Sequence, residues 1–282
     1  MSRIGQLRIL TRRMATGGIR ASLAHVARHP DRIWLHGRRL LTGDVVGLGN
    51  RYSTSDRSAD VRWTAEFTRM PEPTVLRMFD ELDAETEFSD DLRGRYAAAR
   101  PEWAESFDFG RFRSLYALVR LLAPETVVET GVHDGLSSSL ILKALSANGS
   151  GHLVSVDRVS PDLPPTQSGP GWLVPDHLRD RWSLELGDAV RLLPRIAAER
   201  APVDLFLHDS DHSVAHRRFE FTTIKQSMAP EGMILSDDDE PSDGLLRGLA
   251  ESWDMAYFPP PGGVLGIGGV RPTLWLAPSL AD

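Results

Sequence analysis

Hydrophobic residues in the second half of the chain come in short runs that alternate with stretches of helical periodicity. Runs that are apolar throughout are typical of strands buried on both faces of a parallel sheet. The pattern predicts strands at Thr126–Thr130, His152–Val156, Trp182–Glu185, Val203–Leu207 and Met233–Leu235. It predicts the intervening helices at Arg111–Leu122, Leu136–Ala147, Ala189–Glu199 and Ser213–Ser227. The fold class is therefore α/β, with a doubly wound, mostly parallel sheet.

The pattern changes after the fifth predicted strand. A helix is predicted at Gly244–Ser252, followed by strands at Met255–Phe258 and Val264–Val270 around a Pro-Pro-Pro-Gly-Gly turn. Two strands joined by a tight turn pair antiparallel, so we expect a hairpin at the edge of a seven-stranded sheet.

The first hundred residues are mainly helical in pattern and carry no recognisable motif. Apolar residues at helical spacing predict a short amphipathic helix within residues 4–14, suited to a subunit interface or, less readily, a membrane surface. Residues 45–65 are polar and indicate a loop or linker, and helices are predicted at Pro73–Leu82 and Asp90–Ala99. We divide the chain into an accessory segment, 1–105, and a main domain, 106–282.

Charge is distributed unevenly along the chain. The first 60 residues hold eleven arginines and four acidic residues, whereas the whole chain of 282 residues has a net charge of −7. The acidic main domain disfavours a nucleic-acid partner, because phosphate contacts need clustered Lys or Arg. We expect a small-molecule substrate and a homo-oligomer formed through the N-terminal segment. The arginine-rich start also fits an organelle transit peptide.

Composition excludes several classes of protein. The chain has no cysteine, so disulfide scaffolds, thiolate zinc sites and cysteine nucleophiles are excluded, and any metal must bind carboxylates or imidazoles. It also has no apolar stretch long enough for a membrane span and no secretory signal, which predicts a cytoplasmic protein.

A glycine turn follows the first predicted strand. The strand ends at Glu129-Thr130, the chain turns at Gly131 and Gly135, and a helix begins near Ser137. Glycines let the backbone approach a ligand, and the helix N-terminus presents free N–H groups. Such a turn can equally reflect tight packing. Glu129 would repel a pyrophosphate, which argues against a nicotinamide cofactor and favours a ligand without phosphate.

Acidic residues end the next two strands. Asp157 follows the second strand at the distance expected of an acid that binds ribose hydroxyls, and Asp188 follows the third. Asp188 could instead cap the following helix. The combination resembles the class I S-adenosylmethionine-dependent methyltransferases, which implies a Rossmann-like fold. The resemblance implies cofactor-binding roles for Glu129, Gly131, Gly135, Ser137, Asp157, Asp188 and His208.

Two further clusters follow the fourth and fifth strands. They are His208-Asp209-Ser210-Asp211-His212 and Ser236-Asp237-Asp238-Asp239. In a parallel sheet both lie at the carboxyl ends of neighbouring strands, where ligands bind. So many carboxylates would repel each other unless a cation, an arginine or protonation relieves them.

This half of the chain, roughly 105–270, resembles a bacterial family that includes the macrocin- and mycinamicin-type sugar O-methyltransferases. The resemblance rests on Phe206–Ser213, the Pro230-Glu231-Gly232 turn and the loop Gly171–Pro175. It implies a biosynthetic O-methyltransferase, with Asp209, Asp237 and Asp238 as Mg²⁺ ligands, and with Asp209 and His212 as catalytic residues. The first acid of the pair is often Glu in metal-using members and is Asp237 here.

The chemistry explains why these groups are useful. An alcohol is a poor nucleophile while protonated, and the imidazole of His212, with an ordinary pKa of ~6.5, suits a general base. Mg²⁺ could hold substrate hydroxyls, whereas an arginine between the carboxylates would remove the metal and leave His212 as base. The alternative is a metal-dependent hydrolase or hydroxylase using His208–His212 and Asp237–Asp239.

The remaining candidates have simpler interpretations. His216 is expected to face solvent, and His208 to end its strand with its ring bonded to backbone. His133 could touch the cofactor or merely close the loop. The proline-rich loop 160–175 predicts a lid with Trp172 covering the ligand, although a rigid loop with Trp172 packed inward also fits.

Overall fold

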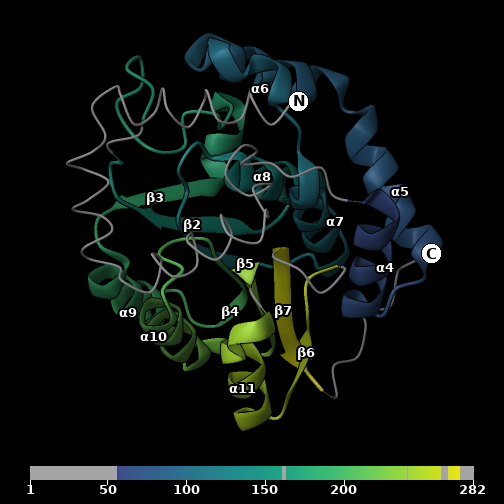
Figure 1. Cartoon of the computed structure of the whole chain (residues 1–282), viewed down its shortest axis with the longest axis vertical. Helices are drawn as coiled ribbons and strands as arrows, with labels where there is room; N and C mark the ends of the chain where they lie inside the picture. Colours follow the sequence, from purple (N-terminus) through teal and green to yellow (C-terminus); the bar gives the residue numbers. More distant parts are fainter. Residues whose placement is uncertain (1–55, 161–162, 240, 262–265, 274–282) are drawn as a thin grey trace, which may run out of the picture. The chain divides into compact units, whose positions relative to one another are not determined.

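The computed structural model describes residues 56–160, 163–239, 241–261 and 266–273. Seven strands form one sheet in the order β3-β2-β1-β4-β5-β7-β6 (Figure 1). They are β1 (Thr126–Thr130), β2 (His152–Asp157), β3 (Trp182–Leu186), β4 (Val203–His208), β5 (Met228–Asp239), β6 (Met255–Phe258) and β7 (Gly266–Pro272). The first five pair in parallel, and β7 pairs antiparallel with both β5 and β6. The predicted Rossmann-like sheet with its C-terminal hairpin is confirmed.

Helices cover both faces of the sheet. They are α4 (Arg57–Thr68), α5 (Glu72–Ala84), α6 (Thr86–Ala99), α7 (Arg113–Leu122), α8 (Leu136–Asn148), α9 (Ala189–Glu199), α10 (Val214–Lys225) and α11 (Leu245–Ser252). Short 3₁₀ turns lie at η3 (Pro101–Ser106), η4 (Gly110–Phe112), η5 (Asp176–Arg181) and η6 (Pro241–Asp243). None of the helices in the described ranges combines the length and apolar character needed to cross a bilayer.

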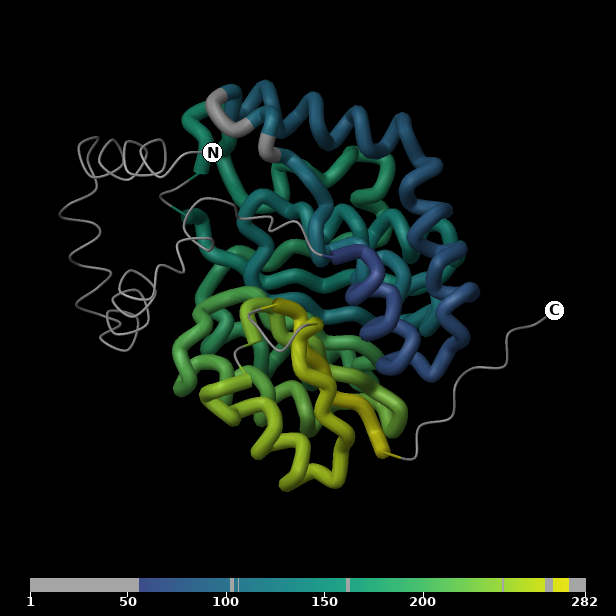
Figure 2. The backbone as a smooth tube through the Cα atoms, turned by 45° about the vertical axis from the view of Figure 1, so that its right-hand side comes forward, coloured from purple at the N-terminus to yellow at the C-terminus, as the bar shows by residue number. Residues whose placement is uncertain are grey.

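The core explains which helices cover which face. Helices α9, α10 and α11 bury Leu193, Phe221 and Leu249 in one cluster with strand residues such as Val154 and Phe206. Helices α4, α5 and α7 form a second apolar cluster. Figures 1 and 2 show the two groups of helices on opposite sides of the sheet. Both faces of the central strands are thus buried, as their continuous apolar runs predicted.

One part of the N-terminal prediction needs correction. The segment 56–65 was predicted as loop, but helix α4 begins at Arg57, capped by the Asp56 carboxylate, which accepts a hydrogen bond from the Ser58 amide. Helix α4 packs on the hairpin, where the Trp63 indole donates to the Pro259 carbonyl at 2.8 Å. The sequence of helix α4 resembles a loop because its buried face is built partly from polar residues, namely Asp60, Thr64 and Thr68.

Helices α4–α6 belong to the same compact unit as the sheet. The proposed division between residues 105 and 106 falls within this unit and stays a prediction. The predicted helices of the accessory segment are present as α5 and α6. The amphipathic helix predicted within residues 4–14, and the oligomer interface assigned to it, lie outside the described residues.

Strand β5 is longer than predicted and irregular. Its pairing with β4 skips from Met228 to Met233, so the expected turn at residues 230–232 bulges out between the paired positions. Its pairing with β7 is interrupted again between Ser236 and Asp239. The second bulge contains Asp237 and Asp238, and Asp238 has a left-handed backbone with φ of 50°. Left-handed aspartates are uncommon and concentrate at functional sites.

The glycine turn after β1 is held by the neighbouring strand. Gly131 has φ of +84°, and a Cβ placed there would lie 2.0 Å from the Asp209 carbonyl oxygen. The Asp209 amide in turn donates to the Thr130 carbonyl at 2.7 Å. Gly131 is therefore required for the close packing of β1 against the end of β4, which is the packing interpretation of this turn.

We predict that Gly131→Ala destabilises the protein by about 2 kcal/mol or more, because the added methyl group overlaps backbone that cannot move away. Chemical denaturation measures the change. Gly94→Ala is the matched control, since nothing lies within 4 Å of its Cβ position in helix α6, and it should be neutral or slightly stabilising. Equal stabilities for the two variants would contradict the packing argument.

Candidate active site

The carboxyl ends of β1 and β2 bring the glycine turn and Asp157 together. One carboxylate oxygen of Asp157 accepts hydrogen bonds from the amides of Val132 and His133, at 2.9 and 2.7 Å. The other accepts from its neighbour Arg158. The predicted ribose acid therefore lies directly beside the turn, and it also fixes the turn's backbone.

Glu129 and Ser137 are adjacent but face inward. The Glu129 side chain is fully buried and accepts hydrogen bonds from the hydroxyls of Ser137, Ser138 and Ser155 at 2.6 to 2.7 Å. Burial raises the pKa of this carboxyl despite the three hydroxyls. Both residues were predicted to bind the cofactor, but these bonds tie the start of helix α8 to the sheet. A direct role of either residue in cofactor binding stays a prediction.

Gly135 and Asp188 also have local structural roles. Gly135 has φ of +93°, and a Cβ there would lie 2.7 Å from the Gly171 Cα. The Asp188 carboxylate caps helix α9 by accepting from the Val190 amide at 2.9 Å, as its alternative interpretation held. The end of β3 still lies beside Asp157, because the Gly187 amide donates to the Asp157 carbonyl.

Part of the loop predicted as a lid, residues Gly171–Leu173, is attached to the glycine turn. The Gly171 and Leu173 amides donate to the carbonyls of His133 and Asp134, each at 2.9 Å. Trp172 is only 9% exposed and stacks on Tyr96 at 6.1 Å between ring centroids. The interpretation of Trp172 as a cover over the ligand was wrong. Two backbone hydrogen bonds and an aromatic partner on helix α6 hold this part of the loop in place.

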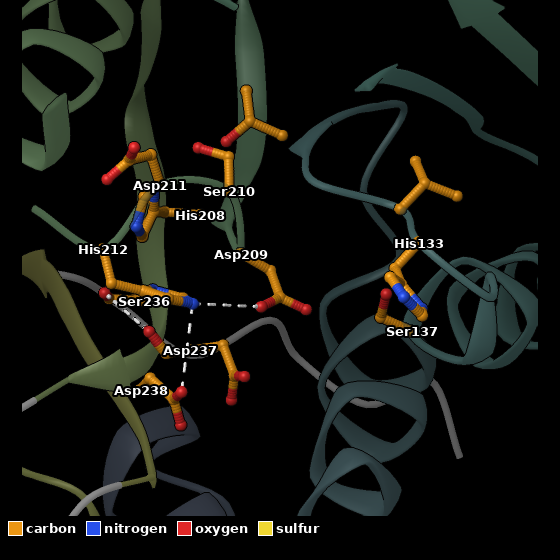
Figure 3. A network of polar contacts seen from close by, with 12 residues as sticks. His133, Ser137, His208, Asp209, Ser210, Asp211, His212, Ser236, Asp237 and Asp238 are labelled. Atoms are coloured by element: carbon orange, nitrogen blue, oxygen red, sulfur yellow. Dashed lines mark hydrogen bonds and ion pairs between the residues drawn. The ribbon is translucent and has the colours of Figure 1, made fainter. Parts of the chain in front are cut away.

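The rim formed by β4 and β5 brings together the residues predicted to do chemistry. Thr130 pairs with His208, and His208 with Ser236, so the three strands end at the same level. Figure 3 shows the His212 ring lying between Asp209 and Asp238. Its Nε2 atom is 3.8 Å from an Asp209 oxygen and 3.9 Å from an Asp238 oxygen. The ring is 26% exposed, so it is accessible to a substrate.

An arginine lies against the same carboxylates. Arg111, on η4, donates from Nε and Nη2 to the two carboxylate oxygens of Asp237, each at 2.6 Å. Its Nη2 also donates to Asp238 at 3.1 Å. The side chain is 17% exposed and its guanidinium lies 5.2 Å from the centroid of the Phe112 ring. This is the strong, planar arrangement of two parallel charge-assisted hydrogen bonds.

The charges of the rim follow from this contact. Burial opposes ionisation of Asp237, but the Arg111 guanidinium outweighs it and lowers the pKa of that carboxyl. Burial, together with the charges of Asp237 and Asp238, raises the pKa of Asp209 well above its ordinary value. Burial alone would lower the pKa of Arg111, yet the carboxylates raise it overall. One fixed positive charge therefore compensates a crowded group of acids.

The predicted Mg²⁺ ligands do not fit a metal in this arrangement. Both oxygens of Asp237 point to Arg111, and Asp238 shares the same guanidinium. Within the described ranges, no group of three or more His, Asp or Glu side chains is arranged to hold a metal ion. Mg²⁺ requires oxygen ligands converging in near-octahedral geometry, and here the converging oxygens surround an arginine.

His208 and His216 form a network with Glu220 beneath the rim. Glu220, on helix α10, is hydrogen bonded to His208 Nδ1 at 2.6 Å and to His216 Nε2 at 2.8 Å. It also accepts from the hydroxyls of Thr130 and Ser210. His216 was predicted to face solvent and His208 to bond backbone; both predictions were wrong. His208 is fully buried, so its ring is not available for direct contact with a cofactor.

Sequence reasoning missed Arg111 and Glu220. Arg111 was assigned only to the start of a helix, although the surplus of carboxylates on the rim implied a compensating cation, and an arginine was among the possibilities. Glu220 follows His216 at i, i+4, a spacing at which side chains on a helix contact each other. Neither residue could be paired with its distant partners from spacing alone.

Sequence comparison identifies the segment that carries this site. A family model described as a methyltransferase domain matches residues 128–238. These residues have the sequence pattern of a methyltransferase domain. The matched segment begins within β1 and ends at Asp238, so it contains the glycine turn, Asp157, Asp209, His212 and the Asp237–Asp238 pair. No curated protein matches the chain.

Several solved structures are similar to the chain at low identity. An O-methyltransferase from Bacillus cereus in complex with S-adenosylhomocysteine is 20% identical, with 66% of this chain and 91% of that chain covered and a TM-score of 0.48. The O-methyltransferase TomG from Streptomyces achromogenes, involved in tomaymycin synthesis and bound to S-adenosylmethionine, is 18% identical, with 64% and 89% covered and a TM-score of 0.49. A methyltransferase from Podospora anserina bound to S-adenosylhomocysteine is 16% identical, with 64% and 87% covered and a TM-score of 0.48.

The contacts of Glu220 make the free energy of unfolding depend on pH, with one contribution lost at low pH and another lost at high pH. His208 and His216 lower the pKa of Glu220, although burial opposes them, so its contribution is present above the ordinary pKa of 4.5 and is lost as pH falls below it. Glu220 raises the pKa of His216, although burial opposes it, so that contribution is present below 6.5 and is lost as pH rises through the folded pKa.

We therefore predict that Glu220→Gln lowers the free energy of unfolding by about 3 kcal/mol. The loss should be largest between pH 4.5 and 6.5, where both contributions are present. Urea denaturation across this range measures it. Glu199→Gln, which affects only an exposed ion pair with Arg195, is the control. A loss independent of pH would show that the ionised pair does not contribute.

Proposed function

We propose that this chain is an S-adenosylmethionine-dependent O-methyltransferase acting on a hydroxyl of a small molecule, such as a sugar or another polyhydroxylated metabolite. The observation that carries the proposal is the match of a methyltransferase-domain model to residues 128–238, the segment in which the glycine turn, Asp157 and His212 meet at one edge of the sheet. Ligands of open parallel sheets bind at this edge.

The cofactor site is assigned to the ends of β1, β2 and β3. S-adenosylmethionine supplies an electrophilic methyl group on a sulfonium centre. Asp157 has the position suited to ribose hydroxyls, and Asp188 lies at the next strand end. Gly131 and Gly135 give the turn its shape, Glu129 and Ser137 hold the start of helix α8 behind it, and His208 lies buried at the end of the neighbouring strand β4.

His212 is assigned as the general base. Its Nε2 would take the proton from the substrate hydroxyl as the methyl group transfers. The Asp238 carboxylate, 3.9 Å from this nitrogen, favours the imidazolium that forms, and Asp209 lies 3.8 Å from the same nitrogen. A substrate hydroxyl could approach His212 from solvent because its side chain is partly exposed. Rate is gained mainly by holding oxygen and methyl carbon in line.

The metal-assisted form of the reaction is not part of this proposal. It would require Asp209, Asp237 and Asp238 to turn toward a common ion, whereas two of them are bound to Arg111. The hydrolase alternative has the same difficulty. It needs the two clusters to share a metal, but His208 is bonded to Glu220 and Asp239 accepts from the Tyr257 hydroxyl at 2.7 Å.

Asp157→Asn tests the cofactor assignment. Isothermal titration calorimetry should show S-adenosylhomocysteine bound by the wild-type chain and bound at least about tenfold more weakly by the variant, because a hydrogen bond to a charged group is lost. Asp180→Asn, an exposed substitution on η5, should bind as the wild type does. Absence of binding by the wild type would overturn the proposed function, and unchanged binding by Asp157→Asn would overturn the assignment of Asp157.

His212→Gln tests the base. Formation of S-adenosylhomocysteine with a panel of polyhydroxylated acceptors should fall by about 10²-fold or more, while the affinity for S-adenosylhomocysteine stays unchanged. His177→Gln on the exposed side of η5 is the control. A variant that retains full turnover would show that another group, or solvent, accepts the proton.

A further inference from the structure

Arg111 lies where the acidic rim needs a positive charge. Its guanidinium contacts Asp237 through two parallel hydrogen bonds and Asp238 through a third. The same charge also acts on Asp209, the third predicted metal ligand. One arginine therefore interacts with all three carboxylates that a divalent ion would have to bind.

We propose that Arg111 takes the place of a divalent cation, so that methyl transfer at this site is independent of metal. This inference rests on the proposed function for the identity of the reaction. Arg111 acts as a positioning residue: it compensates the charge of the rim and holds the Asp238 carboxylate beside His212. Arg111 takes part in no bond making or breaking: the methyl carbon would bond to the substrate oxygen as its bond to sulfur breaks, and the hydroxyl proton would move to His212.

The local structure holds Arg111 in this position. It lies in η4, immediately before helix α7, and the Phe112 amide closes this turn by donating to the Phe109 carbonyl at 3.1 Å. Phe112 is buried and its ring lies beside the guanidinium. An arginine fixed on both sides loses little freedom in forming its ion pairs, and displacing it would leave a buried Asp237 without its partner.

The geometry of the acid pair is matched to a guanidinium. A planar fork can bind both oxygens of one carboxylate while a neighbouring N–H reaches a second carboxylate. A metal would require shorter contacts to oxygens that surround it on several sides. The bulge at Asp237 and Asp238, with Asp238 in a left-handed conformation, directs both side chains toward Arg111. The hydrogen bond from Arg111 to Asp238 offsets the backbone strain of the left-handed Asp238.

Manganese is the probe for this inference, because it substitutes for Mg²⁺ and its free ion gives a paramagnetic resonance signal. Equimolar wild-type chain should leave that signal unchanged. Arg111→Met exposes the carboxylates and should bind Mn²⁺ at least about tenfold more tightly than the wild type. Arg113→Met, which removes a neighbouring arginine paired with Asp108 and Asp83 at the surface, should behave as the wild type.

A second variant keeps the test decisive if Arg111→Met does not fold. Arg111→Lys retains the charge and should exclude Mn²⁺ as the wild type does, while its methyl transfer falls about tenfold or more because lysine cannot bridge the two carboxylates. Binding of Mn²⁺ by Arg111→Lys as tight as by Arg111→Met would contradict a role for the charge.

Activity provides the second readout. Methyl transfer by the wild-type chain should be equal in EDTA and in Mg²⁺. Stoichiometric Mn²⁺ binding by the wild type, or loss of activity in EDTA, would overturn the inference. The Mn²⁺ titration requires neither cofactor nor acceptor, so failure of the proposed function, seen as absent S-adenosylhomocysteine binding, is distinguishable from failure of this inference.

Discussion

The close contact between Gly131 and the end of β4 determines where everything else in the site lies. A glycine with a left-handed backbone lets the turn after β1 rest on the Asp209 peptide, while the Asp209 amide bonds to Thr130. The turn, the acid after β2 and the residues after β4 are thereby held within one small region. Any side chain at this position would separate the glycine turn from the residues after β4.

Charge compensation is the second requirement, and the structure meets it with side chains far apart in the sequence. Arg111 precedes the first strand, Asp209 follows the fourth and Asp237 lies near the end of the fifth. Below the rim the charges are reversed, because Glu220 is a buried anion that lies between two histidines. Asp237 of the rim and the buried Glu220 each have partners of suitable chemistry, so a region rich in ionisable groups remains compatible with a folded sheet.

The sheet could be predicted from the sequence because its determinants are local. Apolar runs bounded by glycine, proline and aspartate identified all seven strands, and the strand ends placed Asp157, Asp209 and His212 at one edge. The errors have physical reasons. Helix α4 buries threonines and an aspartate, which look like a loop in sequence, and Trp172 packs on Tyr96 from a helix whose position no local pattern reveals. Long-range ion pairs, such as Arg111 with Asp237, depend on tertiary packing.

The attachment of the Gly171–Leu173 segment to the glycine turn has a consequence for ligand association. Its ordering takes place when the chain folds, so the loss of conformational entropy for this segment precedes any encounter with a ligand. A small molecule that binds beside the glycine turn would meet the Gly171–Leu173 segment already in its final position. Recognition by this segment then depends on complementarity of shape. The rate at which such a ligand associates is independent of any closing motion of these three residues.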